Sequence, residues 1–206
     1  MPSISHFEIY KPAEPCNLTG DKLKVTMEKA LQEALSEDGR ELNFKGYCIG
    51  QNGLSAIVGD ERLARVKRLN LGGNRIGDQG LKMLSDSPVF SKIQWMELGG
   101  NDIGPEGLVA LIGSRVFSKL KTLNLYRNYL RDEGAVVFAR DNRLEKLEEV
   151  DLAQNEIGDK GLLALASSKA FPNLVAMYLD NNFASAEAKE EAKGGANFRK
   201  LQSLNL

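Results

Sequence analysis

Few side chains in this sequence could carry out acid–base, nucleophilic or metal chemistry. His6 is the only histidine in 206 residues, and it lies in an N-terminal stretch that we expect to be flexible. This placement argues against a Ser/His/Asp or Cys/His catalytic site and against a histidine-based metal site. Cys16 and Cys48 match no zinc or disulfide framework, although Cys48 could be an exposed, reactive thiol. The sequence therefore predicts no catalytic residue, no metal site and no cofactor.

The glycine-rich and acidic stretches do not point to catalysis either. The Leu-Gly-Gly-Asn runs at 71–74 and 98–101 lack the P-loop lysine and the GxGxxG spacing of phosphate-binding loops. Carboxylates could pair near the ends of the predicted strands, but the pattern implies no pocket that would raise the pKa of a carboxyl group. We therefore expect a protein that is not an enzyme.

Molecular recognition is the chemistry that the sequence supports better. Aromatic residues and arginine are enriched in binding hot spots, and here they occupy strand positions that vary from one repeat to the next, followed by acidic residues. The candidate protein-binding residues are Trp95, Glu97, Tyr126, Arg127, Glu149, Asp151, Tyr178 and Asp180. Paired glycines at 72–73 and 99–100 should leave a shallow trough beside the aromatic residues. Ordinary exposed side chains are the alternative interpretation.

A repeat of fixed length positions these residues. The stretch LNLGGNRIGDQGLKML, which begins at Leu69, recurs from Met96, Leu123 and Val150, and in weaker form from Met177. An asparagine marks each copy, 27 residues after the previous one. These asparagines are Asn74, Asn101, Asn128, Asn155 and Asn182. A fixed period of this length indicates a solenoid of stacked coils.

Each repeat can be read as a strand, a turn, a helix and a return loop. Leu69-Asn70-Leu71 alternates as a strand with one buried face does, and Leu81 and Leu84 then follow helical spacing. The asparagine should be a buried amide that satisfies backbone groups in the turn, so that the asparagine column forms a structural ladder. Gly77, Gly104 and Gly158 should supply unusual backbone dihedrals in that turn.

The chain divides into three parts. Residues 1–16 carry three prolines and are predicted to be a flexible segment. Residues 17–38 are predicted to be a helical N-terminal cap, because the end unit of a solenoid has a neighbour on one side only. Residues 39–206 are predicted to form the solenoid, with about six coils and a terminal half-repeat. The final LQSLNL has no polar cap, so we expect either a fragment of a longer array or an end that meets a partner or a second copy.

The pattern LxxLxLxxNxIGDxG followed by an apolar helix resembles the leucine-rich repeat. The long repeat with a full helix looks like the ribonuclease-inhibitor subclass, and the helix starts resemble tandem repeats of bacterial proteins. The resemblance implies an α/β fold, a right-handed horseshoe solenoid with parallel strands on the concave face and helices on the convex face. It places the candidate binding residues on the concave face.

Charge and hydropathy narrow the range of partners. The formal net charge is −1, so we expect neither nucleic acid nor membrane binding. No apolar run of about 18 residues and no signal-peptide core occur, which favours a cytoplasmic protein. We predict a non-catalytic module that binds a protein or peptide on its concave face. A basic segment of the partner should lie near the acidic residues of that face. Two alternatives are a regulatory protein of the GTPase-activating type and an array that self-associates through its C-terminal edge.

Overall fold

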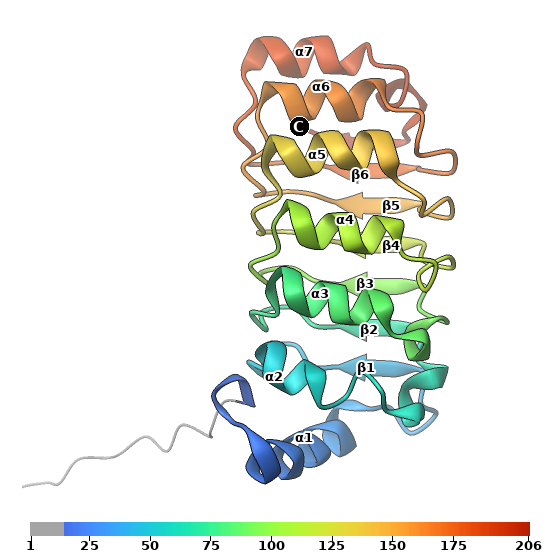
Figure 1. Cartoon of the computed structure of the whole chain (residues 1–206). Coiled ribbons are helices and arrows are strands. Elements are labelled where there is room, and N and C mark those ends of the chain that lie inside the picture. Colours follow the sequence, from blue (N-terminus) through green and yellow to red (C-terminus); the bar gives the residue numbers. More distant parts are fainter. Residues whose placement is uncertain (1–14) are drawn as a thin grey trace, which may run out of the picture.

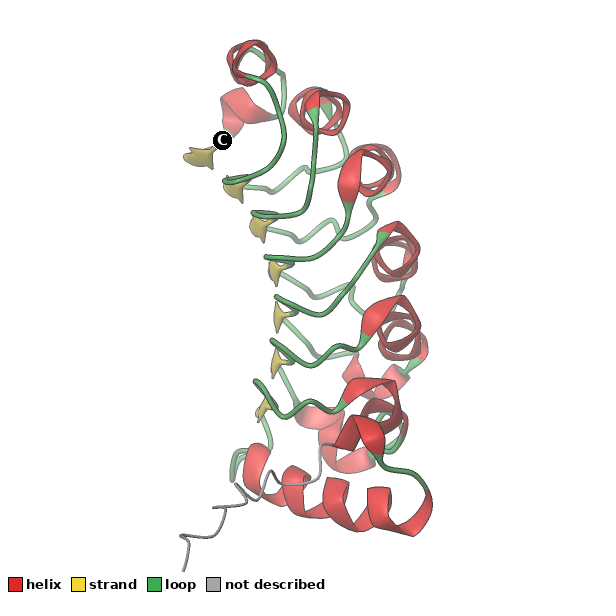
Figure 2. Ribbon diagram, turned by 90° about the vertical axis from the view of Figure 1, so that its left-hand side faces the viewer, coloured by secondary structure: helices red, strands yellow, loops and turns green. Residues whose placement is uncertain are grey.

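Seven short parallel strands form one open sheet in which the strands follow one another in chain order. The computed structural model describes residues 15–206; His6 and the rest of residues 1–14 lie outside the described part. The strands are β1 (Glu41–Asn43), β2 (Arg68–Asn70), β3 (Trp95–Glu97), β4 (Thr122–Asn124), β5 (Glu149–Asp151), β6 (Ala176–Tyr178) and β7 (Ser203–Asn205). The sheet lines the concave face and the helices stack along the convex face (Figures 1 and 2). The predicted α/β leucine-rich-repeat solenoid is therefore confirmed.

The strands pair in a register that carries each repeat position onto the next. Leu42 pairs with Leu69, and Leu69 pairs with Met96. The middle residue of each strand from β1 to β6 is buried, while its neighbours on β1, β2 and β5 are more exposed. Because side chains alternate along a strand, the flanking residues of every strand face the concave side.

The helices supply the other layer of the solenoid. They are α1 (Gly20–Ala34), α2 (Gly50–Ser55), α3 (Gly77–Asp86), α4 (Pro105–Gly113), α5 (Arg131–Asp141), α6 (Asp159–Ser167) and α7 (Ala186–Lys193). Short 3-10 helices complete the loops: η1 (Pro15–Asn17), η2 (Glu61–Arg65), η3 (Pro88–Phe90) and η4 (Phe198–Lys200). Within residues 15–206, none of the helices has the length and apolar character needed to span a bilayer.

One continuous hydrophobic core runs the length of the solenoid between strands and helices. Its large members repeat with the coils, because each coil contributes one apolar residue to the return loop. These residues are Leu63, Phe90, Phe117, Leu144, Phe171 and Phe198, and all are buried. Since a single coil cannot bury its own apolar face, stability depends on contacts between neighbouring coils.

The asparagine column forms hydrogen bonds between successive coils. The Nδ2 atom of Asn101 donates to the carbonyl oxygens of Leu71 and Leu98, at 2.8 and 2.9 Å. Its Oδ1 atom accepts from the backbone N–H groups of Asn74 and Ile76, at 3.1 and 3.4 Å. Asn74, Asn101, Asn128 and Asn155 are buried, whereas Asn182 is half-buried. The amides therefore satisfy turn backbone that water cannot reach.

Aspartates at the starts of α3, α5 and α6 connect their coils to the following ones. The carboxylate of Asp78 accepts from the N–H of Gly104 at 2.6 Å, and Asp132 accepts from Gly158 at 2.8 Å. Gly77 has the expected positive φ of 59°, but the expectation was wrong for Gly104 and Gly158, whose φ values are −104° and −93°. A Cβ atom at either glycine would lie 3.1 Å from the aspartate oxygen. Close approach of the carboxylate, rather than backbone conformation, explains these two glycines.

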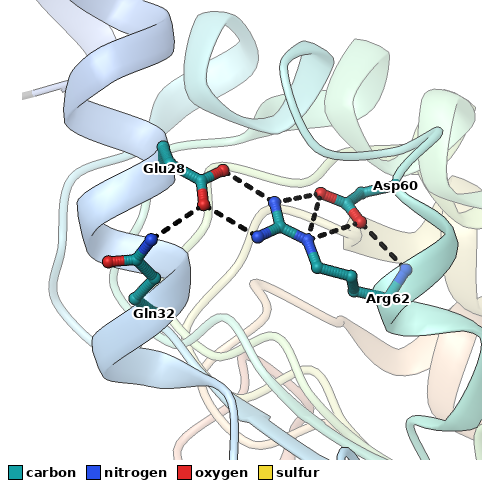
Figure 3. A network of polar contacts seen from close by, with 4 residues as sticks. All are labelled: Glu28, Gln32, Asp60 and Arg62. Atoms are coloured by element: carbon teal, nitrogen blue, oxygen red, sulfur yellow. Dashed lines mark hydrogen bonds and ion pairs between the residues drawn. The ribbon is translucent and has the colours of Figure 1, made fainter.

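Helix α1 lies at the N-terminal end of the stack, beside the first coil (Figure 1). Its apolar stripe, Leu23, Met27, Ala30, Leu31 and Ala34, is buried. On its exposed side Glu28 forms a bidentate ion pair with Arg62, with N···O distances of 2.8 and 2.7 Å (Figure 3). Arg62 also contacts Asp60, next to η2, at 2.6 Å. This network joins α1 to the loop that leads into β2.

Candidate functional site on the concave face

A hollow of about 600 Å³ opens on the concave face over β2 to β4. The paired glycines at 72–73 and 99–100 line it, together with Trp95 and Tyr126. Gly73 and Gly100 have φ values of 71° and 65°, in the left-handed region that favours glycine. The trough expected from the glycines is therefore present, and it depends partly on a turn conformation that the fold requires.

Trp95 carries a stacked cation on its ring. The guanidinium carbon of Arg68 lies 4.2 Å from the ring centroid, within the range of a cation–π interaction. The two residues are register partners on β2 and β3, and Arg68 also lies 4.0 Å from Glu41 on β1. This stack was not predicted from the sequence, although the 27-residue spacing of Arg68 and Trp95 places the two residues at the same repeat position. The stack holds the indole in a defined orientation beside the hollow.

Glu97 and Asp151 are half-buried carboxylates on this face. Burial raises the pKa of Glu97, and a hydrogen bond of 2.6 Å from the N–H of Gly99 only partly offsets the rise. Burial also raises the pKa of Asp151, which is pushed further by the charges of Asp180 and Glu149. The sequence implied no environment that would raise a carboxyl pKa, so that expectation was wrong at these two positions. The sheet brings together Glu97 and Asp151, which are 54 residues apart in sequence, and Asp151 and Asp180, which are 29 residues apart.

The acidic candidates form no close ion pair, although the charge of Lys45 acts on Glu97 and lowers its pKa slightly against the effect of burial. In the described part of the chain, no ion pair within 4.0 Å involves Glu97, Glu149, Asp151 or Asp180, although ten such pairs occur elsewhere. Glu97, Asp151 and Asp180 are half-buried and Glu149 is exposed. Carboxylates that repel one another and have no salt bridge favour the approach of a positively charged group.

The remaining candidates are Tyr126 and Arg127, which follow β4, and Tyr178, which is on β6. They lie on the two sides of β5, the strand that carries Glu149 and Asp151. Tyr126 is exposed and lines the hollow. Arg127 lines both this hollow and a second one of about 350 Å³, which Tyr129 and Phe183 also line. Tyr178 is half-buried on β6 and pairs in register with Asp151. The structure thus places Trp95, Glu97, Tyr126 and Arg127 around one hollow, and the other four candidates on or directly after β5 and β6.

Two exposed aromatic residues that line the second hollow with Arg127 were not among the predicted binding residues. Phe183 has 72% of its surface exposed and Tyr129 has 47%. Tyr129 and Phe183 occupy the same position in their repeats. In other repeats this position holds Arg75, Asp102 and Glu156. A column whose residue type varies is not dictated by the scaffold, and this signal could have identified both residues.

The described residues offer little for catalysis or metal binding. No group of three or more His, Cys, Asp or Glu side chains in residues 15–206 is arranged to hold a metal ion. His6 lies outside the described residues. All buried side-chain nitrogen and oxygen atoms of the described chain have hydrogen-bond partners. The described residues therefore contain neither a cluster of metal ligands nor a buried side-chain polar atom without a partner.

Comparison with known proteins agrees with this architecture. Residues 66–85, 96–111, 118–139 and 143–166 match the family model for the Leucine Rich repeat. An internalin from Listeria monocytogenes is a similar solved structure, with 23% identity and a TM-score of 0.48 over 71% of this chain and 36% of the internalin chain. Actin-binding site 2 of leiomodin-1 is another, with 13% identity and a TM-score of 0.39 over 74% of this chain and 75% of that chain. No curated protein matches the sequence.

The match spans 36% of the length of the internalin chain. The four matched stretches cover the coils from β2 to α6, where the sheet register, the helices and the asparagine column all repeat. These four stretches are therefore leucine-rich repeats, and the chain has the fold of a leucine-rich-repeat solenoid.

Proposed function

We propose that this chain is a non-catalytic module that binds a protein partner on its concave face. Leucine-rich-repeat domains generally mediate protein–protein interactions and are typically not enzymes. The observation that carries the proposal is the hollow beside Trp95 and Tyr126, followed by carboxylates without ion pairs. The full helix in each coil from α3 to α6 supports assignment to the ribonuclease-inhibitor-like subclass. The cytoplasmic location expected from the sequence stays a prediction.

The partner's binding segment carries lysine or arginine next to an apolar side chain. A cationic group that approaches Glu97 and Asp151 is attracted by their charge and relieves their mutual repulsion. The apolar side chain lies against Trp95 and Tyr126, which have rigid rings at the sides of the hollow. Acidic or neutral segments gain no attraction from the carboxylates. The GTPase-activating and self-association alternatives draw no support from these features.

A random peptide library displayed on phage tests the proposal without knowledge of the natural partner. Selection on the full chain should enrich peptides that contain lysine or arginine beside an aromatic or aliphatic residue. The triple variant Trp95→Ala, Tyr126→Ala, Tyr178→Ala should bind the enriched peptides at least about 30-fold more weakly, because hot-spot truncations cost about 2 kcal/mol or more.

A matched control removes exposed apolar side chains from helices. Val25 on α1 and Val109 on α4 are exposed, and the double variant Val25→Ala, Val109→Ala should bind the peptides as the wild type does. Circular dichroism must show that all variants fold. Enrichment of peptides without basic residues, or equal binding by the aromatic triple variant, would contradict the proposal.

A further inference from the structure

Two cysteines that are distant in sequence meet at the N-terminal end of the solenoid. Cys16 belongs to η1, and Cys48 lies in the turn between β1 and α2. Their Sγ atoms are 3.0 Å apart, although the residues are 32 positions apart in the chain. Both residues are half-buried rather than enclosed in the core. This pair takes no part in the concave surface described above.

The backbone around the pair is held in place by several contacts. The N–H of Cys16 donates to the carbonyl oxygen of Cys48 at 3.0 Å. The side-chain amide of Asn52, on α2, donates to the carbonyl oxygens of Cys16 and Leu18, each at 3.2 Å. A Cβ atom at Gly50 would lie 2.6 Å from the Cβ of Cys16. The residue at position 50 must therefore be small for the segment around Cys16 to reach the first coil.

We propose that Cys16 and Cys48 are a redox modification site, and that they form an intrachain disulfide that fastens the segment before α1 to the first coil. A disulfide has an S–S distance of about 2.05 Å, so the two sulfur atoms need to approach by only about 1 Å from their 3.0 Å separation. Backbone contacts on both sides already hold the two chain segments together. A metal site is a poorer explanation, because no third His, Cys, Asp or Glu ligand joins the pair within residues 15–206.

The oxidant is a low-molecular-weight disulfide such as oxidised glutathione. One cysteine thiolate attacks it, forms a mixed disulfide and releases one glutathione thiolate. The second cysteine thiolate then attacks the protein sulfur of the mixed disulfide, forms the Cys16–Cys48 bond and releases the second glutathione thiolate. The two protons lost by the cysteines are taken up by the two glutathione thiolates. The protein pair is oxidised by two electrons and one glutathione disulfide is reduced to two thiols.

The new bond closes a loop that contains the whole of α1. Closing a loop of this length constrains the unfolded chain. Oxidation should therefore raise the thermal midpoint by about 5–10 °C, and it should slow amide hydrogen exchange in α1 more than in α4. Reduction with dithiothreitol should reverse both effects.

The experiment uses the full chain equilibrated in glutathione buffers of different redox poise. Intact-mass spectrometry should show a monomer that has lost two hydrogens and takes up no thiol-alkylating reagent, and the thermal midpoint should rise in parallel. The single variants Cys16→Ser and Cys48→Ser should show no such rise. Two alkylatable thiols at every poise, stable mixed disulfides with glutathione, or only intermolecular dimers would overturn the proposal.

Two glycine variants test the geometry while keeping both cysteines. Gly46 and Gly50 both have positive φ values, of 72° and 55°, so alanine is similarly strained at either position. A Cβ atom at Gly46 meets nothing within 4 Å, whereas one at Gly50 meets Cys16. Gly46→Ala should form the disulfide as the wild type does, and Gly50→Ala should form it at least about tenfold more slowly. Disulfide formation at equal rates in the two variants would contradict the inference.

Discussion

Replacing Asn101 by alanine should destabilise the chain by about 3–5 kcal/mol, because buried backbone groups lose their hydrogen-bond partner. The side chain is fully buried. Its Oδ1 atom accepts from the N–H groups of Asn74 and Ile76, and in the variant neither group has another acceptor nearby. The carbonyl oxygens of Leu71 and Leu98 fare better, since they keep the donors on Asn74 and Asn128, at 2.7 and 3.1 Å.

The magnitude follows from this difference between N–H and C=O groups. An unsatisfied buried donor costs about 1–3 kcal/mol, so two of them cost about 2–6 kcal/mol, and the cavity left by the amide adds to the loss. Globular domains are stable by about 5–15 kcal/mol in total. The variant should therefore show a much lower urea midpoint, or be unfolded at room temperature.

Urea denaturation followed by far-UV circular dichroism measures this loss. Asn43 provides the matched control, because it is an exposed asparagine on the same sheet whose Oδ1 atom accepts only from the N–H of Lys45, at 3.2 Å. Asn43→Ala should change stability by less than about 0.5 kcal/mol. A loss below about 1 kcal/mol for Asn101→Ala, or an equal loss for both variants, would refute the reasoning.

Three further predictions concern the surface charges and the contacts between coils. Binding of a basic peptide should weaken as the pH falls from about 7.5 to about 5. Glu97 and Asp151 have raised pKa values, so they take up protons early in this range, whereas a bound cation favours their ionised form. Binding that titration calorimetry shows to be independent of pH would exclude this linkage. Gly107→Ala should destabilise α4 by about 1–3 kcal/mol, since its Cβ would lie 2.9 Å from the backbone Cα of Asp78 in the preceding coil. Gly113→Ala should be tolerated, because its Cβ would meet nothing within 4 Å. Similar melting of both variants would refute the packing argument. Arg62→Met removes the ion pairs that join α1 to the loop around η2. Amide hydrogen exchange should therefore speed up in α1 and stay unchanged in α4. Unchanged exchange in α1 would show that the ion pairs do not stabilise this helix.

The repeating parts of this fold could be predicted from the sequence because they obey one rule in every coil. Apolar residues at fixed positions specified the strands and the inner faces of the helices, and the asparagines occurred where the chain turns. The contacts that escaped prediction depend on how one coil sits on the next. Asp78 accepts a hydrogen bond from the following coil rather than serving only its own helix, and no spacing within one repeat reveals that.

Non-repeating features were the hardest to predict. Cys16 precedes the repeats, so no register relates it to Cys48, and only the folded path of the chain brings the sulfur atoms together. The concave candidates were chosen by residue type and column. The grouping of four of them around one hollow, and the raised pKa values of Glu97 and Asp151, depend on burial that a sequence does not contain.

The most direct test of the account compares two variants that change the net charge equally. One neutralises acids of the concave face, with Glu97→Gln, Glu149→Gln and Asp151→Asn. The other neutralises exposed acids on the convex helices α4, α5 and α7, with Glu106→Gln, Glu133→Gln and Glu187→Gln. Titration calorimetry with a library-selected basic peptide should show at least about tenfold weaker binding for the concave variant and wild-type affinity for the convex variant. Equal affinities for the two variants would contradict a binding surface on the concave face.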